Sequence, residues 1–303
     1  MATSKDECAH NAPADAGMAL CVLGSGSGGN CSVLIVQKPG ARRRVILIDA
    51  GLGPRTVRTR LAARGVDVRE VTDIVLTHLD ADHFEPTWVN FARSRGGITL
   101  RVHERHVSSA QRAGALFMRC EPFGGDFCIG RESGEAEVAF RPLRNHHDEL
   151  GSYAFRIESG TGSLGFATDL GRVPDEMHEH FAGIDALALE SNYCPRMQME
   201  SARPAFLKQR IMGGAGHLSN QQSFDAVRAI AQRAGLQHVV LLHLSRQCND
   251  PGLIREMYRA TPELAARLTI TSQGSPTGWM EIGRGNGRTT MRPAEHLFAH
   301  AAS

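Results

Sequence analysis

Four titratable side chains directly follow an apolar run in the stretch VLTHLDADHF at residues 75–84. The run itself, DIVLT at 73–77, is typical of a buried strand. Burying a polar group without a partner costs roughly 2–7 kcal/mol, and a bound cation would offset that cost. The stretch therefore predicts a metal site at the mouth of a core strand. The residues concerned are His78, Asp80, Asp82 and His83.

Further candidate ligands follow other apolar runs. They are His147 in RNHHDE, Asp169 in FATDLG and His243 in VVLLHLS. Taken singly, each fits a hydrogen-bonded histidine or a turn aspartate better than a ligand. Their repetition at separate strand ends favours a shared metal centre, because a two-metal site needs about six to eight ligands drawn from several elements.

Strands and helices alternate along the chain, which indicates an α/β fold. Helical signals occur at 54–65, with Pro54 in the first turn, and at 220–235, preceded by a Ser219–Gln222 capping pattern. Residues 105–134 are expected to be helix followed by irregular chain. Strand-like runs occupy 31–36, 44–51, 73–77, 97–103, 137–143, 152–159, 163–169, 184–191 and 238–245.

No repeat or long linker divides the chain of 303 residues. We therefore expect a disordered N-terminal tail over 1–18, one folded domain over 19–284 and a loose C-terminal tail over 285–303. The low aromatic share of 6% argues against an extended base-stacking surface.

Cysteine usage and hydropathy indicate a cytoplasmic protein without a membrane anchor. The seven cysteines are scattered and form no C-x-x-C pair, so neither a disulfide framework nor a zinc knuckle is indicated. No apolar run reaches the roughly 18–20 residues of a spanning helix. The acidic N-terminus lacks the apolar core of a secretory signal.

A glycine-rich stretch, GSGSGG, has the spacing of a dinucleotide-binding loop, and Asp49 follows about 20 residues later. That motif must open a helix, whose N-terminus binds the pyrophosphate. Here the next residues are NCSVLIV, a strand-like run. The glycines are better explained by a tight turn between strands, close enough to a site for backbone N–H groups to meet an anion.

The motifs together resemble the metallo-β-lactamase-fold hydrolases. THLDADH is similar to the T-H-x-H-x-D-H signature of that fold, with one substitution. LGSGSGGNC, ILIDAGL, HHDE, ATDLG, LESN, GHLSN and LLHLS occur in the same order in YycJ/WalJ-like phosphodiesterases, over about residues 20–275. The resemblance implies a four-layer αββα sandwich with a metal cluster along one edge.

The resemblance also implies a ligand set for two divalent metal ions. His78, Asp80 and His147 would hold the first, Asp82, His83 and His243 the second, with Asp169 bridging them. His146 is a rival to His147, but the family places its ligand directly before an aspartate. Asp49 corresponds to a carboxylate that orients a ligand from behind, or is simply a turn aspartate.

Asp80 departs from the family pattern, which has histidine at this position. A carboxylate can still bind a metal ion through oxygen, but it adds negative charge and makes the site harder. Metal preference is thereby expected to shift from zinc towards manganese or iron.

The pentapeptide GHLSN at 216–220 matches a phosphate-contacting element of related nucleases. His217 would touch the scissile phosphate or donate a proton to the leaving oxygen, and Ser219 would lie at a helix N-terminus that attracts phosphate. The alternative is that Ser219 only caps the helix and His217 is a loop residue. Lys208 and Arg210 in FLKQR are further phosphate contacts or members of a solvated face.

The function implied is a metal-dependent phosphodiester hydrolase, a nuclease of the 5′-exonuclease kind that acts on nucleic acid. Its nucleophile would be a hydroxide between two metal ions, either zinc, manganese or iron, with Asp82, Asp169 and His217 as the catalytic residues. Because a fold alone does not fix the substrate, two alternatives remain. One is hydrolysis of a small cyclic phosphodiester, lactone or thioester. The other, suggested by Asp80, is a non-catalytic protein that binds nucleic acid or a partner.

Overall fold

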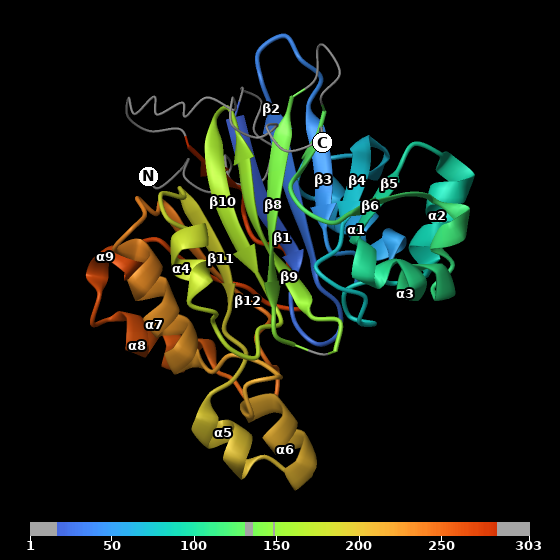
Figure 1. The fold of residues 1–303 in the computed structure, drawn as a ribbon. Helices are drawn as coiled ribbons and strands as arrows, with labels where there is room; N and C mark the ends of the chain where they lie inside the picture. The colour runs from blue at the N-terminus through green and yellow to red at the C-terminus, as the bar shows by residue number, and fades with distance from the viewer. Residues whose placement is uncertain (1–16, 131–135, 148, 284–303) are drawn as a thin grey trace, which may run out of the picture.

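The apolar runs of the sequence pair into two β-sheets that pack face to face, with helices on both outer faces (Figure 1). The computed structural model describes residues 17–130, 136–147 and 149–283. Within them, no helix is long and apolar enough to cross a membrane. This arrangement confirms the expected αββα sandwich.

The first sheet joins seven strands in the described residues, and its four consecutive members β3 to β6 run parallel. In spatial order the strands are β14 (Met280–Ile282), β1 (Gly17–Gly24), β2 (Cys31–Gln37), β3 (Arg44–Ile48), β4 (Val71–Val75), β5 (Thr99–His103) and β6 (Arg119–Phe123).

The second sheet also joins seven strands of the described chain, and β10 to β13 run parallel in it. Their spatial order is β13 (Leu268–Ile270), β12 (His238–Leu242), β11 (Ala186–Glu190), β10 (Gly162–Ala167), β9 (Ser152–Ser159), β8 (Val138–Asn145) and β7 (Phe127–Ile129).

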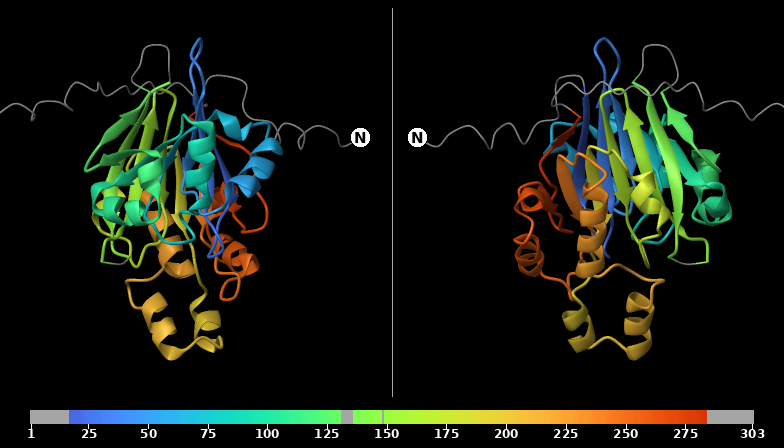
Figure 2. Two further views of the ribbon diagram at one scale, coloured as in Figure 1. Left: turned by 90° about the vertical axis from the view of Figure 1, so that its right-hand side faces the viewer. Right: turned by 60° about the vertical axis from the view of Figure 1, so that its left-hand side comes forward.

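Helices cover the outer face of each sheet, and two further helices project from one end (Figures 1 and 2). The first sheet carries α1 (Pro54–Ala62), α2 (Thr87–Arg95) and α3 (Val107–Arg112), with short 3₁₀ turns η1 (Val68–Glu70), η2 (Glu104–His106) and η3 (Ala115–Phe117). The second carries α4 (Glu176–His180), α7 (Asn220–Ala231), α8 (Pro251–Tyr258) and α9 (Pro262–Ala265). The projecting pair is α5 (Pro195–Glu200) and α6 (Ala205–Met212).

Alternate side chains of each central strand enter different cores, because successive residues of a strand point to opposite faces. In β2, Leu34 packs between the sheets, whereas Val33 and Ile35 face the helices. In β12, Val240 faces the inter-sheet core and Leu241 faces α7 and α8. Both faces are buried, so these strands are continuous apolar runs in the sequence.

Most of the strands expected from the sequence are present, and the differences lie in short elements. The 220–235 pattern forms α7 over Asn220–Ala231, capped by Ser219 and Gln222 as predicted. Residues 105–134 contain not only α3 but also the short strands β6 and β7. β1 begins at Gly17, so Gly17 and Met18, assigned to the tail, belong to a strand. The rest of the expected N-terminal tail, and the C-terminal tail over 285–303, lie outside the described residues.

One edge of the sandwich collects the carboxyl ends of β3, β4, β10, β11 and β12. Three loops at this edge, which follow β1, β3 and β4, are joined by backbone hydrogen bonds. The Ala50 N–H donates to the His83 carbonyl at 2.8 Å, and the Asn30 N–H donates to the Asp82 carbonyl at 2.7 Å. The Gly51 N–H donates to the Asn30 carbonyl at 2.9 Å. A Cβ on Gly51 would overlap the Asp82 carbonyl oxygen, so this close approach requires glycine.

Gly51→Ala should therefore lower the free energy of unfolding by about 1–3 kcal/mol, the usual cost of forcing extra volume into a packed site. Gly53→Ala is the matched control, since the nearest atoms to its added Cβ would be 3.6 Å away. It should cost less than about 1 kcal/mol as an N-cap change. Urea denaturation of both variants measures this difference, and equal stabilities would contradict the close approach.

Candidate metal centre

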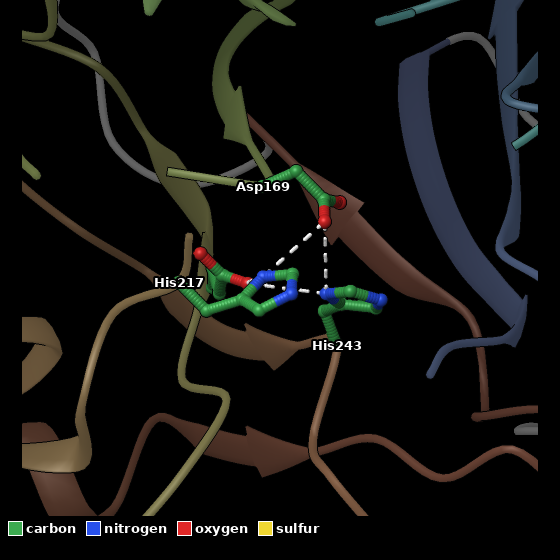
Figure 3. A group of neighbouring side chains, drawn as sticks. Asp169, His217 and His243 are labelled. Carbon is green, nitrogen blue, oxygen red and sulfur yellow. Dashed lines mark hydrogen bonds and ion pairs between the residues drawn. The ribbon is translucent and has the colours of Figure 1, made fainter. Parts of the chain in front are cut away.

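Strand ends from both sheets converge on one cluster of histidines and carboxylates. The first sheet supplies Asp49 after β3 and residues 78–83 after β4. The second supplies His147 after β8, Asp169 after β10 and His243 after β12. Figure 3 shows Asp169, His217 and His243 facing one another from separate loops. Carboxyl ends of strands are the usual place for a ligand site in α/β sheets.

One group of ligand atoms comprises His78, Asp80 and His147. The Oδ2 atom of Asp80 lies 3.8 Å from Nε2 of His78 and 3.7 Å from Nε2 of His147. Atoms bound to one tetrahedral Zn²⁺ at about 2.0–2.2 Å are roughly 3.3–3.6 Å apart. The three atoms are thus close to the spacing that a single ion requires.

A second group comprises Asp82, His83 and His243. The Oδ2 atom of Asp82 lies 3.2 Å from Nε2 of His243 and 3.7 Å from Nε2 of His83. Both histidines are buried, and the Asp82 side chain is 25% exposed. This group has the same near-tetrahedral spacing as the first.

Asp169 lies between the two groups. Its Oδ2 atom is 2.9 Å from Nε2 of His83, and its Oδ1 atom is 4.0 Å from Nε2 of His147. One carboxylate therefore reaches a histidine of each group, which is the position expected for a bridging ligand.

Each of the four histidines in these groups is held through its Nδ1 atom, which leaves Nε2 facing the cluster. The Nδ1 partners are Thr77 Oγ1 for His78 at 3.0 Å, Asp49 Oδ2 for His83 at 2.9 Å, Gly216 O for His147 at 3.0 Å and Glu190 Oε1 for His243 at 3.1 Å. Such partners fix the tautomer and ring orientation of metal-binding histidines.

The hydrogen bonds of His78 leave a buried lone pair that fits a metal ion. The Thr77 hydroxyl donates to Asp49 at 3.0 Å, so it accepts from Nδ1–H of His78. Nε2 of His78 is buried and has no hydrogen-bond partner among the described residues. Burial lowers the pKa of this imidazole well below its usual value, and the nearby His83 adds to the effect. A neutral imidazole with an unused lone pair is the form that binds a cation.

Asp49 and Glu190 are two fully buried carboxylates that support the cluster from behind, one in each sheet. Asp49 accepts hydrogen bonds from the Thr77 backbone N–H at 2.8 Å and from His83. It thus has the surroundings expected of an orienting carboxylate.

Glu190 was not among the candidate site residues. Its Oε1 atom accepts from Nδ1 of His217 at 2.8 Å and of His243 at 3.1 Å. Its Oε2 atom accepts from the backbone N–H groups of Leu170 at 2.8 Å and Leu218 at 3.2 Å. Its signal in the sequence was a carboxylate at the end of the apolar run IDALALES, the same signal that identified the other residues.

The carboxylates dominate the electrostatics of the cluster. Burial lowers the pKa of His147 and of His243, but neighbouring carboxylates outweigh it and raise these values to about 9 and about 10. The ion pair with His147 lowers the pKa of Asp80 to about 2. Such a concentration of negative charge around imidazole rings is the environment that a divalent cation would neutralise, in place of the protons that these histidines hold without it.

Three residues of the cluster adopt a left-handed backbone conformation. They are Asp49 at φ 59°, Asp169 at φ 54° and His243 at φ 56°, and no other non-glycine residue in the described chain has a positive φ. The conformation is uncommon and costly for such residues, and strained backbone of this kind gathers at functional sites. In each case the chain turns sharply as it leaves a strand, which directs the side chain into the cluster.

The remaining candidate residues lie around this centre or away from it. The Nδ1 atom of His217 is 3.3 Å from Oδ1 of Asp169, and its side chain is 20% exposed. Ser219 is buried and caps the N-terminus of α7 through a capping box. This agrees with the alternative interpretation, in which Ser219 caps the helix. Lys208 donates to the Met199 carbonyl, Arg210 is exposed on α6, and His146 is exposed outside the ligand groups.

The glycine-rich stretch GSGSGG joins β1 to β2, and a strand rather than a helix follows it. This topology excludes the dinucleotide-binding interpretation, because the pyrophosphate would lack its helix N-terminus. The loop instead supports the candidate metal centre. Its Ser25 hydroxyl accepts from the His243 backbone N–H at 2.7 Å.

Two bacterial exodeoxyribonucleases are similar to this chain in sequence. Exodeoxyribonuclease WalJ of Streptococcus pneumoniae strain D39 is 26% identical over 234 residues, which cover 77% of this chain and 84% of the pneumococcal protein. Exodeoxyribonuclease YycJ of Bacillus anthracis is 26% identical over 241 residues, covering 79% of this chain and 87% of that protein.

Solved structures share the fold. A diphosphatase from the PhnP family has a TM-score of 0.58 at 20% identity, covering 88% of this chain and 98% of its own. Zn²⁺-bound PqqB from Methylobacterium extorquens has a TM-score of 0.60 at 18% identity, covering 85% and 99%.

The model of the beta-lactamase superfamily domain matches residues 44–244, more than half of the chain. This range contains every residue of the cluster, from Asp49 to His243. The resemblance inferred from the motifs is thereby confirmed, and the chain belongs to the beta-lactamase superfamily.

Proposed function

We propose that this protein is a metal-dependent phosphodiester hydrolase that acts on nucleic acid as an exonuclease. The observation that carries the proposal is the hydrogen bond between His217 and Glu190. The Nδ1 atom of His217 lies 2.8 Å from Oε1 of Glu190, next to the candidate metal ligands. Nδ1 of His217 is thus used to orient the ring, and Nε2 remains available to a substrate. The two similar bacterial proteins named exodeoxyribonucleases support the same reaction class.

The fold implies divalent metal ions, and the cluster offers ligands for two. His78, Asp80 and His147 would hold the first, Asp82, His83 and His243 the second, and Asp169 would serve both. When bound, such ions act as Lewis acids towards water and the phosphoryl oxygens. Because both sheets contribute candidate ligands to one centre, they support a single hydrolase domain, whose first strand begins at Gly17 rather than at residue 19.

The protein residues then provide orientation and proton transfer. Glu190 accepts from Nδ1–H of His217 and fixes the ring, so that in the imidazolium form Nε2–H can donate to a phosphate oxygen or to the leaving oxygen. The N-terminus of α7 follows at Asn220 and presents its positive dipole end next to this histidine. The His217 imidazole and the dipole would both stabilise the negative charge that develops on the phosphoryl group.

A substrate panel tests this proposal against its alternatives. We expect hydrolysis of bis(p-nitrophenyl) phosphate and faster turnover of 5′-phosphorylated DNA or RNA per active site. Turnover confined to small cyclic phosphodiesters, lactones or thioesters would favour the small-molecule alternative. Metal binding without any turnover would favour the non-catalytic alternative.

The purified protein should contain roughly two transition-metal ions per chain, because the candidate ligands exceed what one tetrahedral ion can use. Elemental analysis by mass spectrometry measures this content. Chelation should abolish hydrolysis, and zinc or manganese should restore it. Asp169→Ala should lower the metal content, whereas His238→Ala, at the far end of β12, should not. A chelated protein with full activity would overturn the proposal.

Asp80 should determine which metal supports turnover. Its carboxylate is within 3.8 Å of both histidines of the first group, so manganese should support more activity than zinc in the wild type. Asp80→His should move the preference towards zinc, because imidazole suits that ion better. Assays of wild type, Asp80→His and Asp80→Ala in each metal measure the change. The same preference in all three proteins would mean that Asp80 is not a ligand.

His217→Ala should lower kcat by roughly 10²–10⁴-fold, the range for removal of a general acid. The metal content should remain that of the wild type. Glu190→Gln should also lower kcat, because the weaker acceptor orients His217 less firmly. Steady-state kinetics and metal analysis of the same preparations test both statements. Loss of metal in His217→Ala would instead identify His217 as a ligand.

A further inference from the structure

Helices α5 and α6 form a small arm that projects from one end of the sandwich (Figures 1 and 2). The arm, defined here as residues 195–212, begins shortly after Glu190 and ends shortly before His217. Both of those residues belong to the candidate site. A ligand that reaches the site from this end would therefore pass the arm.

The base of the arm is fixed to the body of the protein. The Cys194 backbone N–H donates to the Cys248 carbonyl at 2.8 Å, and the Arg203 guanidinium contacts Ser245 and Gln247 at 3.4 Å. Ile211 packs with Tyr193 and Cys248 in a small apolar cluster beneath the arm. Ser245 and Gln247 follow His243, so the arm is connected to the strand end that carries a candidate ligand.

The arm leaves large apolar side chains exposed. Phe206 is 73% exposed and Met199 is 60% exposed, although Ile211 and Gln198 of the same helices are buried. The fold does not require an exposed phenyl ring at Phe206, because the apolar cluster beneath the arm is built from other residues. An exposed aromatic ring is a common contact for a ligand with flat faces, such as an unpaired base.

The charge of the arm indicates an anionic ligand. Four of its residues are cationic and one is acidic: Arg196, Arg203, Lys208, Arg210 and Glu200. Arg196 and Arg210 are exposed and form no ion pair within the described chain, so their charges are available. Cations beside an aromatic ring are the combination with which proteins bind single-stranded nucleic acid.

We propose that the arm is a contact surface for single-stranded nucleic acid, in which Phe206 stacks on a base and the cations bind the adjacent phosphates. The inference rests on the proposed function and names the part of the protein that distinguishes a polymer from a small phosphodiester. A single ring stacks on a single base, so the low aromatic share of the chain does not conflict with it. The other occupant to consider is a second copy of this chain, which the same experiment tests.

The test compares Phe206→Ala and Phe206→Tyr with Phe117→Ala, a matched control at a phenyl ring that is 61% exposed near α3. Fluorescence anisotropy measures Kd for a labelled single-stranded DNA and for RNA of the same sequence. Kinetics with bis(p-nitrophenyl) phosphate reports on the metal centre. Light scattering gives the oligomeric state.

Phe206→Ala should raise Kd by roughly fivefold or more, the scale expected for loss of one stacked base. Phe206→Tyr should restore it, and Phe117→Ala should match the wild type. Arg196→Ala should reduce the slope of log Kd against log salt by about 0.7, the value for one phosphate contact on a single strand. All four variants should hydrolyse bis(p-nitrophenyl) phosphate at the wild-type rate.

An unchanged Kd in Phe206→Ala would overturn the inference. A wild-type dimer that Phe206→Ala converts to a monomer, with Kd unchanged, would assign the surface to a contact between copies. Failure of the wild type to hydrolyse any phosphodiester would instead overturn the proposed function. Because anisotropy does not need turnover, it would still test the arm in that case.

Discussion

Two buried carboxylates, Asp49 and Glu190, each orient one histidine of the second candidate ligand group. A buried carboxylate is costly unless its oxygens accept several hydrogen bonds. Asp49 accepts from Thr77 and His83, and Glu190 accepts from two backbone N–H groups and two histidines. Removing either would leave donors without partners and free the imidazole rings to rotate. The orientation of these imidazole rings therefore depends on both carboxylates.

Each carboxylate belongs to a different sheet, so the centre forms only when the sheets pack together. Asp49 and His83 come from the first sheet, and Glu190 and His243 come from the second. The apolar layer between the sheets, with Leu34 and Val240 on opposite sides, fixes their separation. The 2.9 Å contact between His83 and Asp169 then joins the two halves. The distances within the site therefore depend on the packing of the core between the two sheets.

The sequence predicted the strands and the ligand candidates because both depend on local pattern. A titratable residue after an apolar run is visible without knowledge of the fold, and His78, Asp169 and His243 are such residues. The role of Glu190 depends on partners at Leu170, Leu218 and the two histidines, which only the tertiary structure brings together. The short helices α5 and α6 likewise lack a long periodic pattern, so their projection from the body could not be predicted.

The two ligand groups differ in how far they are ordered before an ion arrives. His83 and His243 are fully buried, and every nitrogen of these rings has a partner at a fixed position. In the other group, the Asp80 side chain is 47% exposed, and Nε2 of His78 has no hydrogen-bond partner in the part of the chain that the structure describes. Ordering a side chain on binding costs free energy, and a preorganised group avoids that cost. The second group is consequently the rigid part of the centre, and the first is the part where a substitution such as aspartate for histidine can be accommodated.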